Sequence, residues 1–128
     1  MIAYDAVVLR LVPRVHVPSG EALGVALHAR QAHFLGIRWI VPPRDVADRW
    51  QVSPVLLTRY LDGLATICDG SPDGGPIGRL PPSERFHWLA ATRSTILQPS
   101  EVHTGLCDAP VDALNRIVES LMPTTETR

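Results

Sequence analysis

Residues 4–12 read YDAVVLRLV, and this stretch decides the fold. Both of its alternating sets of side chains are apolar. They are Ala6, Val8 and Val12 on one face, and Val7, Leu9 and Leu11 on the other. A strand with two apolar faces is typical of the interior of a sheet that is covered on both sides. Arg10 shares the first face, so we predict a cation near the centre of this sheet, held by an ion pair.

Two further strands are predicted to extend this one into an antiparallel meander. In Ala22–Ala29 (ALGVALHA) large and small side chains alternate, which indicates a strand with another group packed closely on its small face. The large set is Leu23, Val25 and Leu27, and the small set is Ala22, Gly24 and Ala26. The third strand, Phe34–Val41, follows at the distance of a hairpin.

Helical periodicity follows the strands. A short helix is predicted over Pro43–Trp50, with proline at its first position. Ser53 is a good N-cap for a longer helix that ends at Gly70 and carries Cys68 on its apolar, core-facing side. The glycine- and proline-rich segment Gly70–Pro82 is predicted to be a loop.

The C-terminal part is predicted to return to the sheet and to end in a helix. Ser83 caps a short helix, Glu84–Ala91, and Thr92–Gln98 is the fourth strand. The next loop, which includes His103, leads to a last helix that is capped by Asp108.

The predicted order of elements is β-β-β-α-α-α-β-α. A meander followed by a block of helices favours an α+β fold: an antiparallel sheet of about four strands with helices mainly on one face. The fourth strand is expected to return beside the first. We expect one domain over residues 1–122 and a frayed tail over residues 123–128.

Composition and charge exclude several classes of function. The net charge of −1 disfavours nucleic-acid binding, and all 12 basic residues are arginine. The absence of lysine excludes a lysine Schiff base and a P-loop. The sequence has no signal peptide and no apolar run of about 20 residues, so we expect a cytoplasmic protein with no membrane segment.

The segment Leu80–Cys107, LPPSERFHWLAATRSTILQPSEVHTGLC, concentrates polar and aromatic side chains. Such groups are costly to bury without partners, so their clustering indicates a site or an interface. The segment holds Arg85, His87, Trp88, Arg93, Ser94, Thr95, Gln98, His103, Thr104 and Cys107. No spacing among them matches a motif that fixes a chemistry.

Two interpretations of this segment, a metal site and a cysteine nucleophile, are weak. His103 and Cys107, with His87 or His16, could supply zinc ligands, but only one local pair is present. Cys107 could act as a thiolate with His103 or His87 as base, although a cysteine packed beneath a helix start is commoner. We expect no metal site and no cofactor.

An anion site is a stronger alternative. Arg85 and Arg93 flank a predicted helix-to-strand turn, where Ser94 supplies a hydroxyl and Trp88 a stacking face. Phosphate or a nucleotide would suit a binding protein or enzyme centred on Arg85, Arg93 and His103. The competing structural explanation is a network of arginines and carboxylates that holds the helix to the sheet.

A protein-binding surface is the interpretation that requires the fewest specific residues in the sequence. Three tryptophans in a small domain, with arginine in the same segment, match the composition of interface hot spots. We therefore predict a non-enzymatic accessory or regulatory protein that binds a partner through the Trp- and Arg-rich surface of Leu80–Cys107. The last helix and the tryptophans would also suit a homodimer.

Four blocks of the sequence resemble an uncharacterised bacterial family, number 3037 among the domains of unknown function. They are YDAVVLRLVPRV at 4–15, GV at 24–25, FLG at 34–36 and LPPSERFHWLAATRSTILQPSEVHTGLC at 80–107. The resemblance spans Tyr4 to about Leu121. It implies a small single-domain protein, often encoded beside a protein similar to the HipA-type kinases, and hence a HipA-like kinase as a partner.

The resemblance also carries a set of polar and aromatic positions over to this chain. They are Arg10, Arg85, Trp88, Arg93, Ser94, Gln98 and His103. We take these as candidate binding residues for a ligand or a partner, with no individual roles assigned. At one position the chain departs from the family, since Leu23 replaces the asparagine that usually precedes the GV pair.

Overall fold

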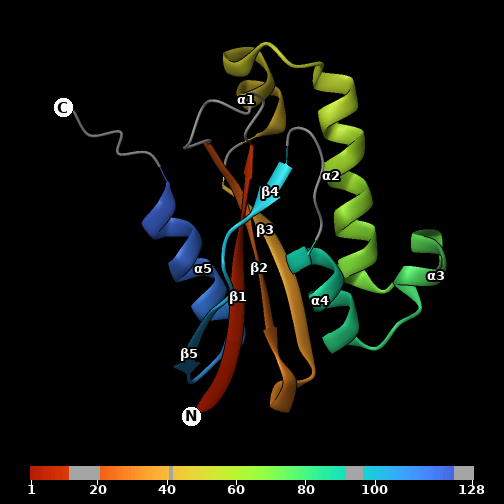
Figure 1. Cartoon of the computed structure of the whole chain (residues 1–128). Coiled ribbons are helices and arrows are strands. Elements are labelled where there is room, and N and C mark those ends of the chain that lie inside the picture. Colours follow the sequence, from red (N-terminus) through yellow and green to blue (C-terminus); the bar gives the residue numbers. More distant parts are fainter. Residues whose placement is uncertain (12–20, 41, 92–96, 123–128) are drawn as a thin grey trace.

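Strand β1 runs through the middle of an antiparallel sheet, as its two apolar faces predict (Figure 1). The computed structural model describes residues 1–11, 21–40, 42–91 and 97–122. Its strands are β1 (Ile2–Leu11), β2 (Glu21–Ala29), β3 (Phe34–Trp39), β4 (Leu97–Pro99) and β5 (His103–Cys107). The order across the sheet is β3-β2-β1-β4, and β5 also pairs with β1. The predicted α+β fold and its antiparallel meander are therefore confirmed.

Two short strands share the outer edge of β1. Strand β4 pairs with the last residues of β1 and β5 with the first, both antiparallel. Between β4 and β5, Ser100 makes the hydrogen bonds to Val8 that a paired strand would otherwise make. Its Oγ accepts a hydrogen bond from the N–H of Val8 at 2.9 Å, and its own N–H donates to the carbonyl of Val8 at 2.7 Å. The predicted return of the fourth strand beside the first is confirmed. The segment with His103, predicted as a loop, is instead strand β5, because the long edge of β1 requires partners along its length.

The helices form two layers of unequal size. They are α1 (Pro43–Trp50), α2 (Pro54–Asp69), α3 (Gly75–Gly78), α4 (Pro82–Ala91) and α5 (Pro110–Leu121). Helices α1, α2 and α4 cover one face of the sheet, with α3 outside them, and α5 covers the other face (Figure 1). Helices thus lie mainly on one face, as predicted. No helix in the described ranges is long and apolar enough to cross a membrane.

Helix ends follow the sequence signals in α2 but less well elsewhere. The Oγ of Ser53 accepts the N–H of Leu56, and Gly70 ends α2 in a left-handed conformation with φ of 71°. The predicted loop after Gly70 is partly wrong, because it contains a 3₁₀ turn, Pro72–Gly74, and helix α3.

The two predicted caps in the C-terminal part are also wrong. Ser83 lies inside the first turn of α4, which begins one residue earlier at Pro82. Ala109, not Asp108, occupies the N-cap of α5, directly before Pro110. In both helices the proline starts the helix, since its fixed φ suits the first position.

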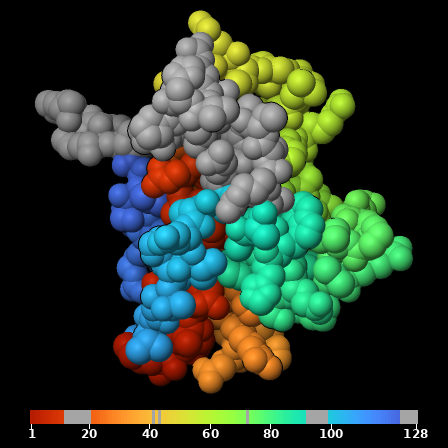
Figure 2. Space-filling model, viewed as in Figure 1, coloured from red at the N-terminus to blue at the C-terminus, as the bar shows by residue number. Residues whose placement is uncertain are grey.

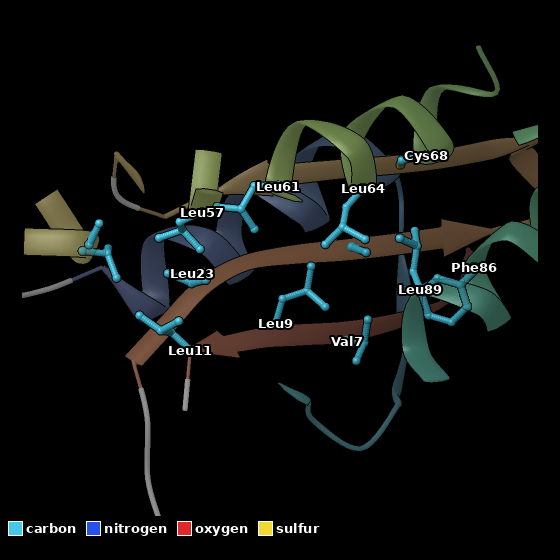
Figure 3. Close-up of a cluster of buried hydrophobic side chains, with 13 residues drawn as sticks. Val7, Leu9, Leu11, Leu23, Leu57, Leu61, Leu64, Cys68, Phe86 and Leu89 are labelled. Atoms are coloured by element: carbon cyan, nitrogen blue, oxygen red, sulfur yellow. The ribbon is translucent and has the colours of Figure 1, made fainter. Parts of the chain in front are cut away.

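The larger core lies between the sheet and helices α1, α2 and α4 (Figure 3). Its fully buried members from the sheet include Val7, Leu9 and Leu11, the set predicted to share one face of β1. Those from the helices are Val46, Ala47, Leu57, Leu61, Leu64, Cys68, Phe86 and Leu89. Cys68 is therefore a core residue, as predicted, and burial raises the pKa of its thiol to about 12.

The smaller core lies between the other face of the sheet and α5. Ala6 and Val25 contribute from the sheet, and Leu114 and Val118 from α5. Cys107 is also buried here, so both cysteines are free thiols packed in a core.

A bulge in β2 changes the predicted alternation at one residue. The register passes from Leu9 opposite Gly24 to Arg10 opposite Ala22, which leaves Leu23 as the extra residue. Leu23 therefore joins the larger core, although its predicted companions Val25 and Leu27 face α5. The prediction of close packing on the small face is confirmed at Gly24, where an added Cβ would lie 2.4 Å from the ring of Trp39.

Replacing Leu9 by alanine should test the central role of β1. The side chain is completely buried, so Leu9→Ala should lower the free energy of unfolding by about 2–5 kcal/mol. Urea denaturation followed by circular dichroism measures this. Leu106→Ala is the control, because Leu106 is 61% exposed on β5 and its loss should change stability by no more than about 0.5 kcal/mol. Equal losses in the two variants would contradict the placement of Leu9.

Candidate functional site

The sheet separates residues that were predicted to form one site. Arg85 and Trp88 lie on α4, which packs on the face of the larger core. His103 is exposed on β5 and pairs with Ala6, whose side chain faces α5 on the opposite side of the sheet. Arg93 and Ser94 lie outside the described residues. Arg85 and His103 therefore do not converge on a common ligand position.

Arg10 and Gln98 meet as paired residues of β1 and β4. Arg10 alternates with Leu9 and Leu11 and so lies on the face that α5 covers, half-buried. The ion pair predicted for Arg10 is not found among the described residues, where the one salt bridge joins Arg49 and Glu21.

Arg85 has a structural task at the end of α2. Its guanidinium donates a hydrogen bond of 2.6 Å to the carbonyl of Leu80. The same group lies against Gly70, where an added Cβ would be 3.2 Å from it. A cation is favourable beside the C-terminus of a helix. For Arg85, contacts with backbone thus stand in place of the predicted ion pairs with carboxylates, none of which is found among the described residues. Arg93, the other arginine of that network, lies outside them.

An apolar groove runs along α2 and ends beneath Trp88. It has a volume of about 560 Å³, and we call it the α2 groove. It is lined by Leu56, Arg59, Tyr60, Gly63, Leu64, Thr66, Ile67, Asp73, Gly74 and Trp88. The groove lies between α2, the turn before α3, and α4. In the view of Figure 2 the segment that holds α3 projects beyond α2 and α4, and so it extends this side of the molecule.

The α2 groove exists because α2 carries two apolar stripes. Leu57 and Leu61 face the core, and Leu64 borders both the core and the groove. Leu56 and Tyr60 lie one position before Leu57 and Leu61 and line the groove, where Tyr60 also touches the core. Leu56 is 63% exposed and lines this groove. An added Cβ on Gly63 would have no atom within 4 Å, so this residue leaves the wall of the groove open.

A second concave region, which sequence reasoning missed, surrounds His28. His28 is the one buried polar residue among those described, with 8% of its surface exposed. Its ring stacks on Phe86 at 5.7 Å between centroids. The strand registers place Thr104, Asp5, His28 and Leu35 in one row across the sheet, beneath the first turns of α4.

We call this region the His28 hollow. It consists of two adjoining depressions that share His28, Arg30 and Ser83. The first is also lined by Gln31, His33 and Pro82, and the second by Ala3, Tyr4, Asp5, His87 and Thr104. The only signal in the sequence was a histidine in an otherwise apolar strand, ALGVALHA.

The surroundings of His28 favour its neutral form. Burial lowers the pKa of its imidazole, and His87, Arg30 and Arg85 lower it further, whereas Asp5 opposes them. At neutral pH the ring therefore carries no charge, although an anion beside it would favour protonation.

The sequence comparisons identify the family. A family described as "Protein of unknown function (DUF3037)" matches residues 6–122. The chain belongs to this family. The match confirms the resemblance seen in the four sequence blocks and covers every described strand and helix in whole or in part. Searches of curated proteins and of solved structures gave no match.

The residues once considered for metal or nucleophilic chemistry do not assemble in this DUF3037 chain. Among the described residues, no group of three or more His, Cys, Asp or Glu side chains could hold a metal ion. Cys107 is buried beneath α5, and His87 lies on the other face of the sheet. His16 lies outside the described residues.

The other two tryptophans also have structural positions. Trp39 and Trp50 both pack against the larger core. The indole N–H of Trp50 donates to Oε1 of Glu21 at 2.8 Å, and Arg49 donates to the same carboxylate, so this cluster fastens α1 to β2. Trp88, which also packs against the larger core, is the tryptophan that lines the α2 groove.

Replacing Arg85 by methionine should separate a structural role from a binding role. Arg85→Met keeps most of the aliphatic length but removes the donor to Leu80 and the cation beside α2. We expect the free energy of unfolding to fall by about 1–3 kcal/mol, measured by urea denaturation. Arg79→Met, at an exposed position in the preceding segment, should change it by no more than about 0.5 kcal/mol. Unchanged stability in Arg85→Met would return Arg85 to the list of binding residues.

Proposed function

We propose that this chain is a bacterial, cytoplasmic, non-enzymatic accessory protein that binds a protein partner in the α2 groove. The observation that carries the proposal is the second apolar stripe of α2, which is left open to solvent beside Trp88. Contiguous apolar surface of this kind marks interaction sites in soluble proteins. Tryptophan, tyrosine and arginine at one groove are the residue types that dominate binding energy at interfaces.

The form of the groove favours a short amphipathic helix of the partner as its occupant. From Leu56 to Ile67 the groove follows 12 residues of α2, a length of about 16 Å. That length matches about three turns of a helix laid along α2, the arrangement in which apolar side chains at i, i+3 or i+4, and i+7 enter a groove.

Two charged side chains at the rim of the α2 groove would set the orientation of the partner helix along it. Arg59 lies near the N-terminal half of the groove and Asp73 near its C-terminal half. Neither is in an ion pair with another described residue. A partner helix with a carboxylate opposite Arg59 and a cation opposite Asp73 would complement both.

The resemblance described above makes a HipA-like kinase the first partner to test. The kinase is co-expressed with the tagged chain, and the complex is isolated at physiological salt. A pull-down from the native host, analysed by mass spectrometry, extends the test to other partners.

A matched pair of substitutions at Gly63 tests the groove. Gly63→Leu should place a side chain in the α2 groove and weaken binding of the partner at least about tenfold, measured by titration calorimetry, because it fills the space for an apolar anchor. Gly63→Ala should leave affinity within about threefold, since its methyl group meets open space. Both should be at least as stable as the wild type, because glycine costs a helix about 0.5–1 kcal/mol relative to alanine.

Each other outcome contradicts part of the proposal. A partner that binds Gly63→Leu as tightly as the wild type would exclude the α2 groove as its site. A chain that is a homodimer in solution and dissociates only in Gly63→Leu would make the groove a contact between copies of this chain rather than a site for another protein.

A further inference from the structure

The His28 hollow combines several groups that a phosphate would satisfy. It is lined by the turn between β2 and β3, which contains Arg30, and by the first turn of α4. These two segments lie at the same end of the sheet (Figure 1). Its two depressions have volumes of about 490 and 430 Å³. These are sizes typical of sites for small molecules, and larger than a free phosphate ion needs.

The first depression contains donors and no carboxylate. Arg30 contributes an exposed guanidinium that forms no ion pair with another described residue. Ser83, in the first turn of α4, contributes a hydroxyl and one of the N–H groups that have no acceptor within a helix. The ten-residue helix α4 also directs its positive end towards this depression.

His28 is an independent sign that the hollow has a ligand. More than nine-tenths of its surface is buried, it lines both depressions, and its ring makes no hydrogen bond with any other described residue. The buried side-chain nitrogen that lacks a partner among the described residues is Nε of Arg85, so the ring nitrogens of His28 are open to the hollow and free to donate to a ligand there. No set of metal ligands is present among the described residues.

We propose that the His28 hollow binds a small phosphate monoester, with the phosphate held by Arg30, Ser83 and His28. The organic part of the ligand then lies in the second depression, against His87 and Thr104. This site is separate from the α2 groove and does not depend on the proposed partner. It also differs from the phosphate site predicted from the sequence, which was centred on Arg85, Arg93 and His103.

Binding of the anion should be coupled to protonation of His28. A bound dianion attracts the imidazolium, and Asp5 assists it, while Arg30, His87 and Arg85 oppose it. The ligand therefore raises the pKa of His28 from its lowered value, and affinity should increase as the pH falls. His33 and His87 also line the hollow and should contribute to the same trend.

The test is a titration of the full chain followed by NMR of the histidine rings. The probes are inorganic phosphate and phenyl phosphate, at ionic strength kept constant with chloride. We expect saturable shifts of the His28 signals, and tighter binding of phenyl phosphate than of inorganic phosphate. Sulfate, whose charge is constant between about pH 5 and 8, should bind more tightly at the lower pH.

Three variants make the result specific. Arg30→Gln and His28→Phe should each weaken binding at least about tenfold, because each removes a charge-assisted hydrogen bond. His103→Phe is the control on the opposite face of the sheet and should bind as the wild type does. Arg30 is exposed, so its variant should fold even if His28→Phe does not.

The opposite results would overturn the proposal. These are shifts that do not saturate or that chloride reproduces, and unchanged affinity in Arg30→Gln. Equal affinity for inorganic and phenyl phosphate would show that the second depression does not bind an organic group. That result would contradict the proposal that the ligand is a monoester.

Discussion

Burial of β1 on both faces is the constraint on which the rest of the structure depends. Leu9 faces three helices, whereas Ala6, on the other side of the same strand, faces α5. Each Å² of apolar surface left in water would lower the stability by about 25 cal/mol. Helices on only one face of the sheet would therefore leave the other apolar face of β1 exposed at a large cost. The chain therefore supplies three helices to one face and, after returning along the edge of β1, sends α5 to the other. Ser100 completes that edge by bonding both backbone groups of Val8, which lie between β4 and β5.

The same constraint explains why the polar segment Leu80–Cys107 is not one site. Its first part must form α4 on one face, and its last part must form β5 at the edge of the sheet. Residues that are close in sequence are thus separated by the sheet itself, and Arg85 is occupied by the end of α2. What the segment does supply is one helix that borders two concave regions. Buried Phe86 and Leu89 fix α4 on the sheet, Trp88 lines the α2 groove, and Ser83 lines the His28 hollow.

Sequence reasoning succeeded where local patterns decide the structure. The two apolar faces of β1 and the Ser53 cap are read from periodicity and end signals, which act over a few residues. It failed where distant contacts decide. The extra residue Leu23 is invisible in an alternating pattern, because a bulge is defined by the partner strand. The α2 groove was missed, although Trp88 was selected, because an apolar stripe does not reveal which part of it other elements will cover. The His28 hollow depends on the register of three strands and on the place of α4, which no single stretch contains.

The histidine at position 28 is difficult to explain by stability alone. A phenylalanine there could keep the stack on Phe86 with an apolar ring. Arg30, Arg85 and His87 disfavour the charged form of the His28 ring, whereas Asp5 favours it. Arg49, by contrast, is paired with Glu21, and Arg85 with a backbone carbonyl, so those cations have structural partners. Arg30 and His28 have none among the described residues, and they border the same depression. Arg30 is exposed and His28 opens to the hollow, so an anion placed between them would contact both side chains.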